Sequence, residues 1–236
     1  MNFADRVGQR RFLLLFISLT LLLTVYPVID QGSAALLTFQ FCFQLVILTG
    51  LFAMRRSRLW LWSGLTLAVP AIAVFWLATL SPASPLRSVT VESASNWSLG
   101  LYLIQLVLFV LRDLFSSSEV TNDRLFGALS AYILLGVAWG FLYTGLELGL
   151  PGSFHLGDGI EPIVSTAVQG HSERPSTLFY FSFVTLTTLG YGDISPIRPF
   201  AQMLVTWEAI LGQAYLTILV ARLVGLHLSQ HAPKPS

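Results

Sequence analysis

A hexapeptide in the last quarter of the chain combines residue types that could bind a cation stripped of its water. It reads Thr188-Leu189-Gly190-Tyr191-Gly192-Asp193. A cation that sheds its hydration shell needs replacement oxygens, and backbone carbonyls can supply them as a ladder. Successive carbonyls point the same way only if the backbone alternates between right- and left-handed conformations. Gly190 and Gly192 permit the left-handed ones. The Thr188 hydroxyl would add an oxygen at the cytoplasmic end of this ladder.

A short apolar and aromatic run precedes the hexapeptide. Pro175, followed by Ser176 and Thr177, predicts a helix start. The run Ser176–Thr187 has about twelve residues, whereas a crossing helix needs about 20. We therefore expect a re-entrant half-helix. A Gly-Tyr-Gly string alone would favour a simple turn, but irregular backbone at membrane depth is tolerated only inside protein or beside water. The loop therefore implies a central assembly.

The half-helix and the hexapeptide resemble the selectivity filter of the potassium channel family, in the form T-x-G-Y-G-D. The resemblance is strong over residues 126–226 and weak before them. It implies a bacterial six-helix channel with one pore loop per chain, and four chains around one pore as a homotetramer. K⁺ would be the permeant ion, with no cofactor. The carbonyls expected to coordinate K⁺ are those of Thr188, Leu189, Gly190 and Tyr191.

The same resemblance assigns roles around the filter. Leu189 and Tyr191 would point away from the ions and pack against the half-helix. Asp193 would brace the half-helix and form a negative ring that draws cations in. The two-helix channels of this family often carry a glutamate on the half-helix where this chain has Val184. Filter support by that carboxylate is therefore expected to be missing.

The last helix resembles the inner helix of these channels. Gly212 lies twenty residues after Gly192, where the two-helix bacterial channels carry a hinge glycine. Leu216, Val220 and Val224 follow at intervals of four on one helical face, which predicts the lining of a water-filled vestibule. The alternative is that this face only packs on the fifth helix.

Other inner-helix residues carry charge or polarity within the membrane. Glu208 lies one turn before Gly212, and an ionisable group at that depth is a functional-site hypothesis by default. We expect Glu208 to support the filter by hydrogen bonding the half-helix through Thr185 or Thr187; a protonated spectator is the alternative. Arg222 is expected to be a snorkelling anchor, with a gate contact as the alternative.

On the fifth helix, Gly136 and Gly140 form a small-xxx-small pair. We expect this pair to pack against the inner helix.

Composition places the whole chain in a membrane. Of 236 residues, 54% are hydrophobic and 11% charged, against roughly a quarter charged in soluble domains. The net charge is +1 with a single lysine, Lys234, which argues against a nucleic-acid partner. The single cysteine, Cys42, excludes a disulfide framework and a Cys-rich zinc site. We recognise no nucleophile–base set, so an enzyme is not expected, and no soluble ligand is predicted.

Six apolar runs predict an all-α membrane protein with six transmembrane helices and the pore loop between the fifth and sixth. They are Phe12–Ile29, Ser33–Met54, Leu59–Ser81, Trp97–Leu111, Phe126–Leu146 and Pro199–Leu226. The fourth is expected to extend past Arg112. The first could instead be a signal peptide, but its length and the lack of a cleavage site favour a retained span.

Basic residues predict the orientation. With both termini cytoplasmic, ten of the thirteen lie inside, and only Arg87, Arg174 and Arg198 lie outside. We expect a multi-pass protein of the cell membrane, in a bacterium its inner membrane.

The chain divides into four parts by this reasoning: a four-helix transmembrane domain (1–115), a cytoplasmic linker (116–125), a potassium-channel pore domain (126–226) and a short cytoplasmic tail (227–236). The loop Ser81–Asn96 is expected to be an outer, flexible one. Voltage sensing requires several arginines on the fourth helix, and Trp97–Leu111 carries none. Voltage gating is therefore not expected.

A second polar group occupies the outer segment before the half-helix. A cation or proton sensor there is less favoured than a solvated turret, because the spacing is too irregular to fix ligand geometry. Its members are His155, Asp158, Glu161, His171 and Glu173.

Two other functions remain open. Potassium uptake transporters use relaxed versions of this filter, but they place four loop units in one chain. A non-conducting regulatory subunit would join other channels. The ten residues after Leu226 leave no room for a nucleotide-sensing domain, so gating is expected from the filter, the bilayer, the four-helix part or a partner protein.

Overall fold

The computed structural model describes residues 10–25, 33–55, 57–80, 88–116, 121–157 and 175–231. Within them the chain is mostly helical, with one two-stranded sheet. The helices are α2 (Arg11–Val25), α3 (Ser33–Met54), α4 (Arg58–Leu80), α5 (Val89–Phe115), α6 (Asn122–Gly149), α7 (Pro175–Leu186) and α8 (Pro199–His231). The strands are β1 (Phe154–Leu156) and β2 (Ile194–Pro196).

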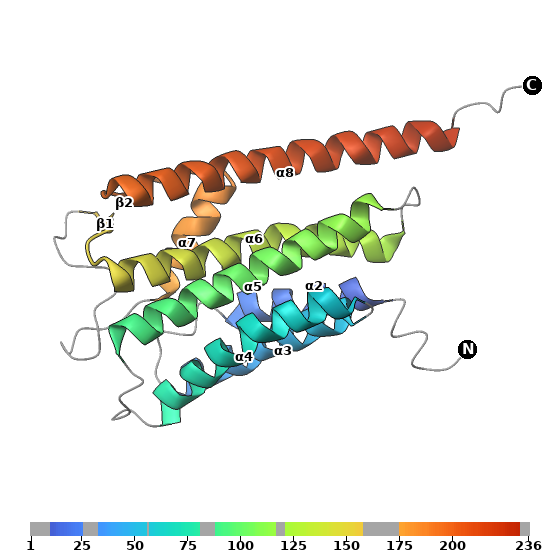
Figure 1. Ribbon diagram of the computed structural model, residues 1–236. Helices are drawn as coiled ribbons and strands as arrows, with labels where there is room; N and C mark the ends of the chain where they lie inside the picture. The colour runs from blue at the N-terminus through green and yellow to red at the C-terminus, as the bar shows by residue number, and fades with distance from the viewer. Residues whose placement is uncertain are drawn as a thin grey trace, which may run out of the picture.

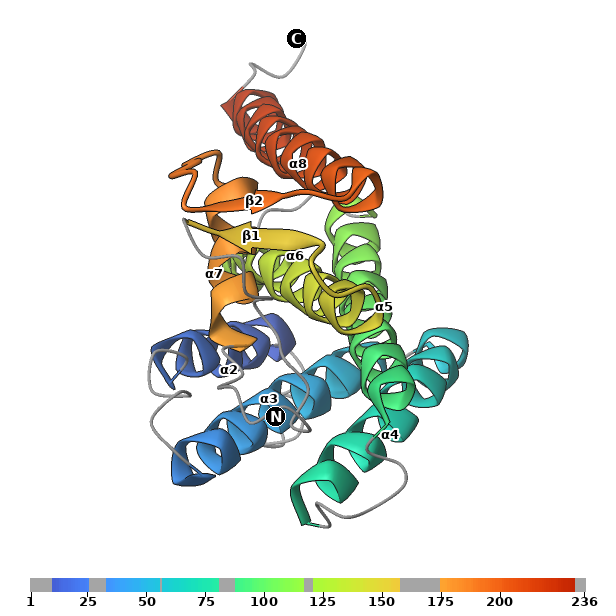
Figure 2. The same ribbon diagram turned by 90° about the vertical axis from the view of Figure 1, so that its left-hand side faces the viewer.

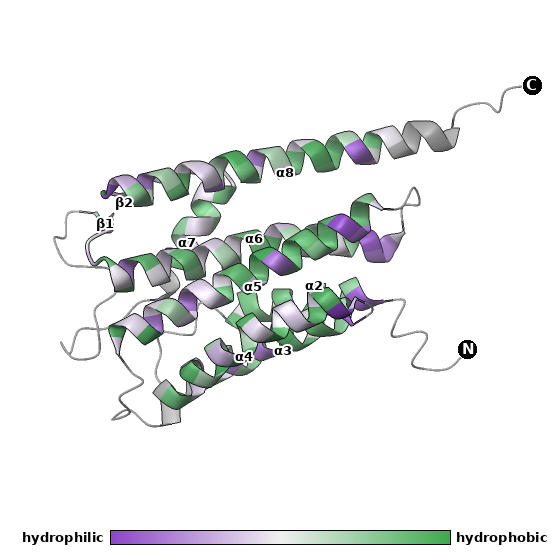
Figure 3. Ribbon diagram, viewed as in Figure 1, coloured by the Kyte–Doolittle hydropathy of each residue, from purple (hydrophilic) through white to green (hydrophobic). Residues whose placement is uncertain are grey.

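Four helices of the described part are long and apolar enough to cross a membrane. They are α5, α6, α3 over Leu37–Met54, and α8 over Pro199–Arg222. Helices α2 and α4 are also apolar, but their qualifying stretches are shorter. Each of the six predicted runs therefore coincides with a helix over its described residues, and four of them meet the length criterion. Figure 3 shows hydrophobic residues along most of these helices.

The helices form a bundle around the α5–α6 pair, which makes the most extensive helix contact (Figure 1). Helix α2 packs on α3 and α6, and α4 packs on α5. Helix α8 lies on the opposite side of this pair from α2, α3 and α4. Between α6 and α8 stands α7, which contacts both and crosses them instead of running alongside (Figure 2). The fold thus holds a short helix between two long ones.

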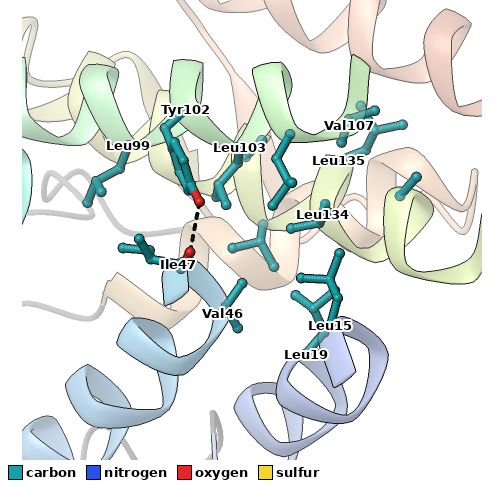
Figure 4. Close-up of a cluster of buried hydrophobic side chains, with 14 of the residues drawn as sticks. Leu15, Leu19, Val46, Ile47, Leu99, Tyr102, Leu103, Val107, Leu134 and Leu135 are labelled. Atoms are coloured by element: carbon teal, nitrogen blue, oxygen red, sulfur yellow. Dashed lines mark hydrogen bonds between the residues drawn. The ribbon is translucent and has the colours of Figure 1, made fainter. Parts of the chain in front are cut away.

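The main core lies where α2 and α3 meet the α5–α6 pair (Figure 4). Leu15 and Leu19 of α2, together with Val46 and Ile47 of α3, are fully or almost fully buried there. The Tyr102 hydroxyl of α5 donates a hydrogen bond to the Ile47 carbonyl at 3.0 Å. A buried phenol usually finds such a partner, so this tyrosine adds apolar contact without an unmet polar group.

Polar contacts fasten α2 to the ends of α5 and α6. The Asp123 carboxylate at the start of α6 accepts the backbone N–H groups of Phe12 (3.1 Å) and Leu13 (3.0 Å). These amides belong to the first turn of α2, where no intrahelical acceptor exists, so Asp123 acts as a cap. Arg11 forms an ion pair with Asp113 of α5. The N-terminal helix is therefore tied to the two central helices at one end of the bundle.

The predicted outer loop Ser81–Asn96 is wrong over its second half, because α5 begins at Val89. The polar residues that suggested a loop instead bond to neighbouring helices. The Ser93 hydroxyl donates to the Gly145 carbonyl of α6 at 2.6 Å, and the Ser95 hydroxyl donates to a carbonyl of α4 at 3.2 Å. Both hydroxyl groups are therefore satisfied inside the bundle. The polar residues of this stretch make contacts between helices and do not form a loop.

Candidate functional site

The half-helix is α7, which begins at Pro175 as predicted and has 12 residues. Its Phe179 and Phe183 rings lie over glycines of α6. A Cβ added at Gly140 or Gly136 would come closer than 3.0 Å to the Phe179 and Phe183 rings, respectively. The expectation that this glycine pair packs against the inner helix is therefore wrong. The glycines instead make room for two aromatic rings of the half-helix.

The segment after α7 turns its amide groups back onto that helix. The Thr188 N–H donates to the Thr185 carbonyl at 2.9 Å, and the Leu189 N–H to the Val184 carbonyl at 2.9 Å. The Gly190 N–H shares the Val184 carbonyl at 3.3 Å. Carbonyls in the last turn of a helix have no intrahelical partner. The three amides satisfy them, and the segment is held close to the end of α7.

The carbonyls of residues 188–192 have a different environment from the amides. Within the described part of the chain, none of these five carbonyls accepts a hydrogen bond. Side chains and backbone at these positions are exposed on the single chain. The N–H groups of residues 188–190 therefore bond to α7, while the carbonyl groups of residues 188–192 have no partner within the described chain. A row of such carbonyls, repeated around an axis, is what replaces the water around a permeating cation.

The backbone of this segment takes the left-handed conformation three times. Gly190 has φ of 59° and Gly192 has φ of 78°, which is the conformation expected of both. Thr188 also has a positive φ, 57°, and this was not expected. A β-branched residue there costs about 1–2 kcal/mol. The Thr188 hydroxyl donates to the Thr187 carbonyl at 2.7 Å. The strain lies at the residue that opens the row of carbonyls.

Aromatic and acidic contacts hold the outer end of the segment. The rings of Tyr191 and Tyr180 stack with centroids 6.5 Å apart and planes inclined by 13°. Tyr180 belongs to α7, and its side chain also hydrogen bonds the Asp193 side chain. The Asp193 carbonyl accepts the Gly157 N–H at 2.8 Å. The Tyr180 contacts join the segment to α7, and the Gly157 contact joins it to the residue after β1. Leu189, in contrast, is 55% exposed on the single chain.

Glu208 of α8 contacts the half-helix, but its partner there is Ser182 and not one of the two threonines expected. Its side chain is 0% exposed and accepts hydrogen bonds from the hydroxyls of Tyr143 and Ser182, both at 2.5 Å. We expected Thr185 or Thr187, which lie one turn further along α7. The Thr187 hydroxyl, just past the end of α7, instead donates to the Phe183 carbonyl of that helix at 2.6 Å. Glu208 therefore joins α6, α7 and α8 at one buried point.

The hydrogen count at this point favours a neutral carboxyl group. The Ser182 oxygen also lies 2.8 Å from the Gly136 carbonyl, yet a hydroxyl carries one proton to donate. If Glu208 is protonated, it can donate to Ser182, and Ser182 can donate to Gly136. Tyr143 then donates to the second carboxyl oxygen, and every group is satisfied. A buried ionised carboxylate without a cation would cost several kcal/mol.

The inner helix presents two environments along its predicted stripe. Gly212 is buried against the end of α7, where an added Cβ would lie 2.7 Å from the Leu186 carbonyl oxygen. Leu216, Val220 and Val224 are exposed on the single chain. Gly212 thus permits close approach of α8 to the half-helix. The hinge and vestibule roles of these residues stay predictions.

Glu147, near the C-terminal end of α6, is a buried acid that was not predicted from the sequence. Its carboxylate accepts the backbone N–H groups of Gly152 (2.9 Å), Ser153 (2.8 Å) and Phe154 (3.1 Å). These residues lead into β1, which pairs antiparallel with β2 ahead of α8. The signal was an acid at the end of an apolar run followed by Pro-Gly. Glu147 thereby fixes the segment on which the sheet begins.

The outer polar group is only partly described. His155 lies in β1, opposite Ser195 of β2. Among the described residues, no three metal-ligating side chains come together. The remaining members lie outside the described residues: Asp158, Glu161, His171 and Glu173.

Arg222, nine residues before the end of α8, contacts the C-terminal end of α5. Its guanidinium donates to the Leu114 carbonyl at 2.6 Å and lies 4.6 Å from the centre of the Phe115 ring. A cation at the C-terminal end of a helix is favoured by the helix dipole. Arg222 therefore links α8 to α5. This contact is additional to the snorkelling role expected from the sequence.

Comparison with known proteins agrees with this geometry. Residues 160–226 match the family model described as ion channel. Two pore potassium channel c of Oryza sativa subsp. japonica is 30% identical over 105 residues, which are 44% of this chain and 19% of the relative. The voltage-gated potassium channel Kch of Escherichia coli (strain K12) is 30% identical over 109 residues, 46% of this chain and 22% of the relative.

A third relative, inward rectifier potassium channel Kirbac3.1 of Paramagnetospirillum magnetotacticum, is 38% identical over 96 residues, 36% of this chain and 29% of the relative. The chain thus spans less than a third of the length of each of these relatives. No solved structure matches the chain.

Proposed function

We propose that the chain, whose pore segment resembles those of potassium channels, conducts K⁺ passively and selectively across a cell membrane. The observation that carries the proposal is the separation of donors and acceptors after α7. The amides of Thr188, Leu189 and Gly190 are taken up by α7, while the carbonyls of residues 188–192 accept no bond in the described chain. K⁺ is the permeating substrate. Its ligands are the carbonyls of Thr188, Leu189, Gly190 and Tyr191, with the Thr188 hydroxyl.

The conducting unit is a homotetramer. One loop supplies carbonyls on one side of an ion only, and four copies are needed to surround it. The exposure of Tyr191 (65%) and Val220 (57%) on the single chain supports an assembly in which neighbours or pore water cover these surfaces. Asp193 supplies the outer negative ring, Gly212 the hinge, and Leu216, Val220 and Val224 the vestibule wall.

The chain crosses the membrane six times, with both termini in the cytoplasm. Residues 126–226 form the pore domain, and residues 1–115 form a four-helix domain that does not sense voltage. The absence of arginine from Trp97–Leu111 supports this, since each gating charge contributes roughly 2.3 kcal/mol per 100 mV. A bacterial inner membrane fits the ten basic residues assigned to the cytoplasmic side.

Reconstitution of the purified chain tests the proposal. We expect unitary currents in a planar bilayer and K⁺ flux into proteoliposomes that greatly exceeds Na⁺ flux. Slow, saturable K⁺ uptake without unitary currents would instead identify a transporter. Silence of the purified chain, with currents only on co-expression with another channel, would identify a regulatory subunit.

A further inference from the structure

Helix α7 ends in a Schellman motif directly before the proposed filter. The Leu189 N–H donates to the Val184 carbonyl and the Thr188 N–H to the Thr185 carbonyl, both at 2.9 Å. This nested pair of bonds defines the motif, which holds the residue after the helix cap in the left-handed conformation. That residue is usually glycine, and here it is Thr188, with φ of 57°. The end of α7 and the first residue of the hexapeptide are therefore one structural unit.

The motif leaves two carbonyls of the last turn to be satisfied by other groups. The last four carbonyls of a helix have no intrahelical partner, and the two bonds of the motif serve only the first two of them. The Thr187 carbonyl accepts the Thr188 hydroxyl at 2.7 Å. The Leu186 carbonyl accepts the hydroxyl of Tyr132, a residue of α6, at 3.2 Å. Among the described residues, Tyr132 is the group from another helix that completes the end of α7.

The Leu186 carbonyl is enclosed by protein in the single chain. Leu186 is 0% exposed, so water has no access to this carbonyl. Helix α8 passes so close that a Cβ added at Gly212 would lie 2.7 Å from the carbonyl oxygen. A buried acceptor that loses its hydrogen-bond partner is costly. The Tyr132 hydroxyl therefore has no ready substitute at this point.

Tyr132 is itself held in place by α8. Its ring packs against the Tyr215 ring, with centroids 5.6 Å apart and planes inclined by 34°. Tyr215 is 8% exposed, and its hydroxyl donates to the Ala128 carbonyl of α6 at 2.5 Å. Ala128 lies one helical turn before Tyr132, so Tyr215 contacts both the Tyr132 ring and the turn that carries it. These contacts fix the direction in which the Tyr132 hydroxyl points.

The Tyr132 bond acts on the filter through successive peptide units, each of which is planar. The unit between Leu186 and Thr187 is held on both sides. Tyr132 binds its carbonyl, and its N–H donates to the Phe183 carbonyl at 3.0 Å. The next unit is held on both sides by the N–H and hydroxyl bonds of Thr188. The Thr188 carbonyl then follows as the first without a partner in the described chain, so its direction depends on the two units before it.

We propose that Tyr132 is a positioning residue for K⁺ selection. Its hydroxyl fixes the Leu186 carbonyl, and through the end of α7 it sets the direction of the Thr188 carbonyl, the first of the coordinating row. Tyr215 contributes by holding the Tyr132 ring. This inference rests on the proposed channel function and adds to it a residue outside the pore loop.

Tyr132→Phe removes the hydroxyl and keeps the ring. We expect the K⁺ over Na⁺ permeability ratio, obtained from the bi-ionic reversal potential of the reconstituted chain, to fall about fivefold, the equivalent of one net hydrogen bond. Tyr102→Phe is the matched control, because the Tyr102 hydroxyl also donates to a helix carbonyl, that of Ile47 at 3.0 Å (Figure 4). The control should lower the unfolding temperature by a similar amount and leave the permeability ratio unchanged.

Tyr215→Phe tests the second contact. It removes the bond to Ala128 but keeps the stacked ring, so the permeability ratio should fall by less than in Tyr132→Phe. If Tyr215 acts through Tyr132, the double variant should be no worse than Tyr132→Phe alone. If Tyr132→Phe does not assemble, a lowered ratio in Tyr215→Phe supports the proposal and an unchanged ratio contradicts it.

Solid-state NMR of the chain in proteoliposomes gives a readout that does not depend on ion flux. The sequence contains a single Thr-Thr pair, residues 187 and 188. Labelled threonine therefore gives one cross-peak between the Thr187 carbonyl carbon and the Thr188 amide nitrogen. We expect this cross-peak to move in Tyr132→Phe and to stay in place in Tyr102→Phe.

Two results would overturn the proposal. One is an unchanged permeability ratio in an assembled Tyr132→Phe channel. The other is an equal fall of the ratio in Tyr102→Phe, which would indicate a general effect of lost stability. A parent chain that does not discriminate between K⁺ and Na⁺ would instead refute the proposed function, and the cross-peak alone would then decide whether Tyr132 fixes the backbone before the hexapeptide.

Discussion

A single carboxyl group joins three helices beside the proposed filter. Glu208 of α8 forms hydrogen bonds with the hydroxyls of Tyr143 of α6 and Ser182 of α7. The family position on the half-helix is Val184 here, so no carboxylate supports the filter from that side. We infer that Glu208 is a neutral group that stabilises the contact of the three helices through its hydrogen bonds. Its contribution to stability should therefore remain when an uncharged side chain of the same shape replaces it, and be lost when the side chain is removed.

Glu208→Gln and Glu208→Ala separate charge from shape. The amide keeps an oxygen for Tyr143 and a donor for Ser182, so we expect Gln to stay within about 1 kcal/mol of the parent stability. Alanine leaves the buried Tyr143 hydroxyl without its acceptor, removes the donor to Ser182 and creates a cavity, which should cost about 2–4 kcal/mol. Thermal unfolding of the detergent-solubilised assembly measures both. Equal destabilisation by Gln and Ala would mean that Glu208 works as a charge.

Two glycines of α6 position the half-helix. Gly136 and Gly140 receive the Phe183 and Phe179 rings, and Gly212 on the other side receives the end of α7. Helix α7 thus packs between α6 and α8, with close approaches at these three glycines. Because the filter amides bond to the last turn of α7, any shift of this helix moves the filter.

Gly140→Ala should disturb α7 and the filter together. The added methyl group would overlap the Phe179 ring, and overpacking of this kind costs about 1–3 kcal/mol. We expect a lower unfolding temperature and reduced K⁺ over Na⁺ selectivity. Gly64→Ala on α4 is the matched control, since its Cβ would meet neighbours no closer than 3.4 Å and should be tolerated. Identical behaviour of the two variants would refute the packing role of Gly140.

The sequence predicts the helices better than their contacts. Apolar runs and Pro175 suffice for the long helices and for α7, and the extension of the fourth helix past Arg112 is confirmed by the end of α5 at Phe115. Helical spacing says which residues share a face, but it does not say which neighbour that face meets. The partner of the Gly136–Gly140 pair was therefore predicted wrongly, and Ser182 was missed as the partner of Glu208.

Short strands and conformational strain also escaped prediction. Strands β1 and β2 have three residues each, too few for any alternation to be recognised. The positive φ of Thr188 contradicts the ordinary preference of a β-branched residue. Such strain persists only where surrounding contacts impose it. These contacts, from Thr185 and Val184, are visible only in the folded chain.

In the whole molecule, polar contacts link helices from the two proposed domains, and in the described α5 the one arginine is Arg112. Arg11 and Asp123 tie α2 to α5 and α6, and Arg222 ties α8 to the end of α5. Arg112, the one arginine of α5, is exposed at its inner end. These contacts connect α2 to α5 and α6, and α5 to α8.

Conductance should therefore depend weakly on voltage. Over about 200 mV, we expect open probability to change by less than about threefold, since no set of gating charges crosses the field. Single-channel recording in a planar bilayer measures this. A steep relation, with several charges moved per assembly, would show that residues 1–115 sense voltage after all.

If backbone carbonyls after α7 select K⁺, the reversal potential under bi-ionic K⁺/Na⁺ conditions reports that selection. Within a single chain, a Cβ added at Gly190 would meet nothing within 4 Å, so the strain that Gly190→Ala adds within the chain comes from the positive φ and costs about 1–2 kcal/mol. Gly225→Ala, in an open position of α8, is the control. We predict a strongly K⁺-selective potential for the parent and the control, and a shift toward zero for Gly190→Ala in an assembly that still forms. An unchanged K⁺-selective potential in Gly190→Ala would contradict the filter assignment.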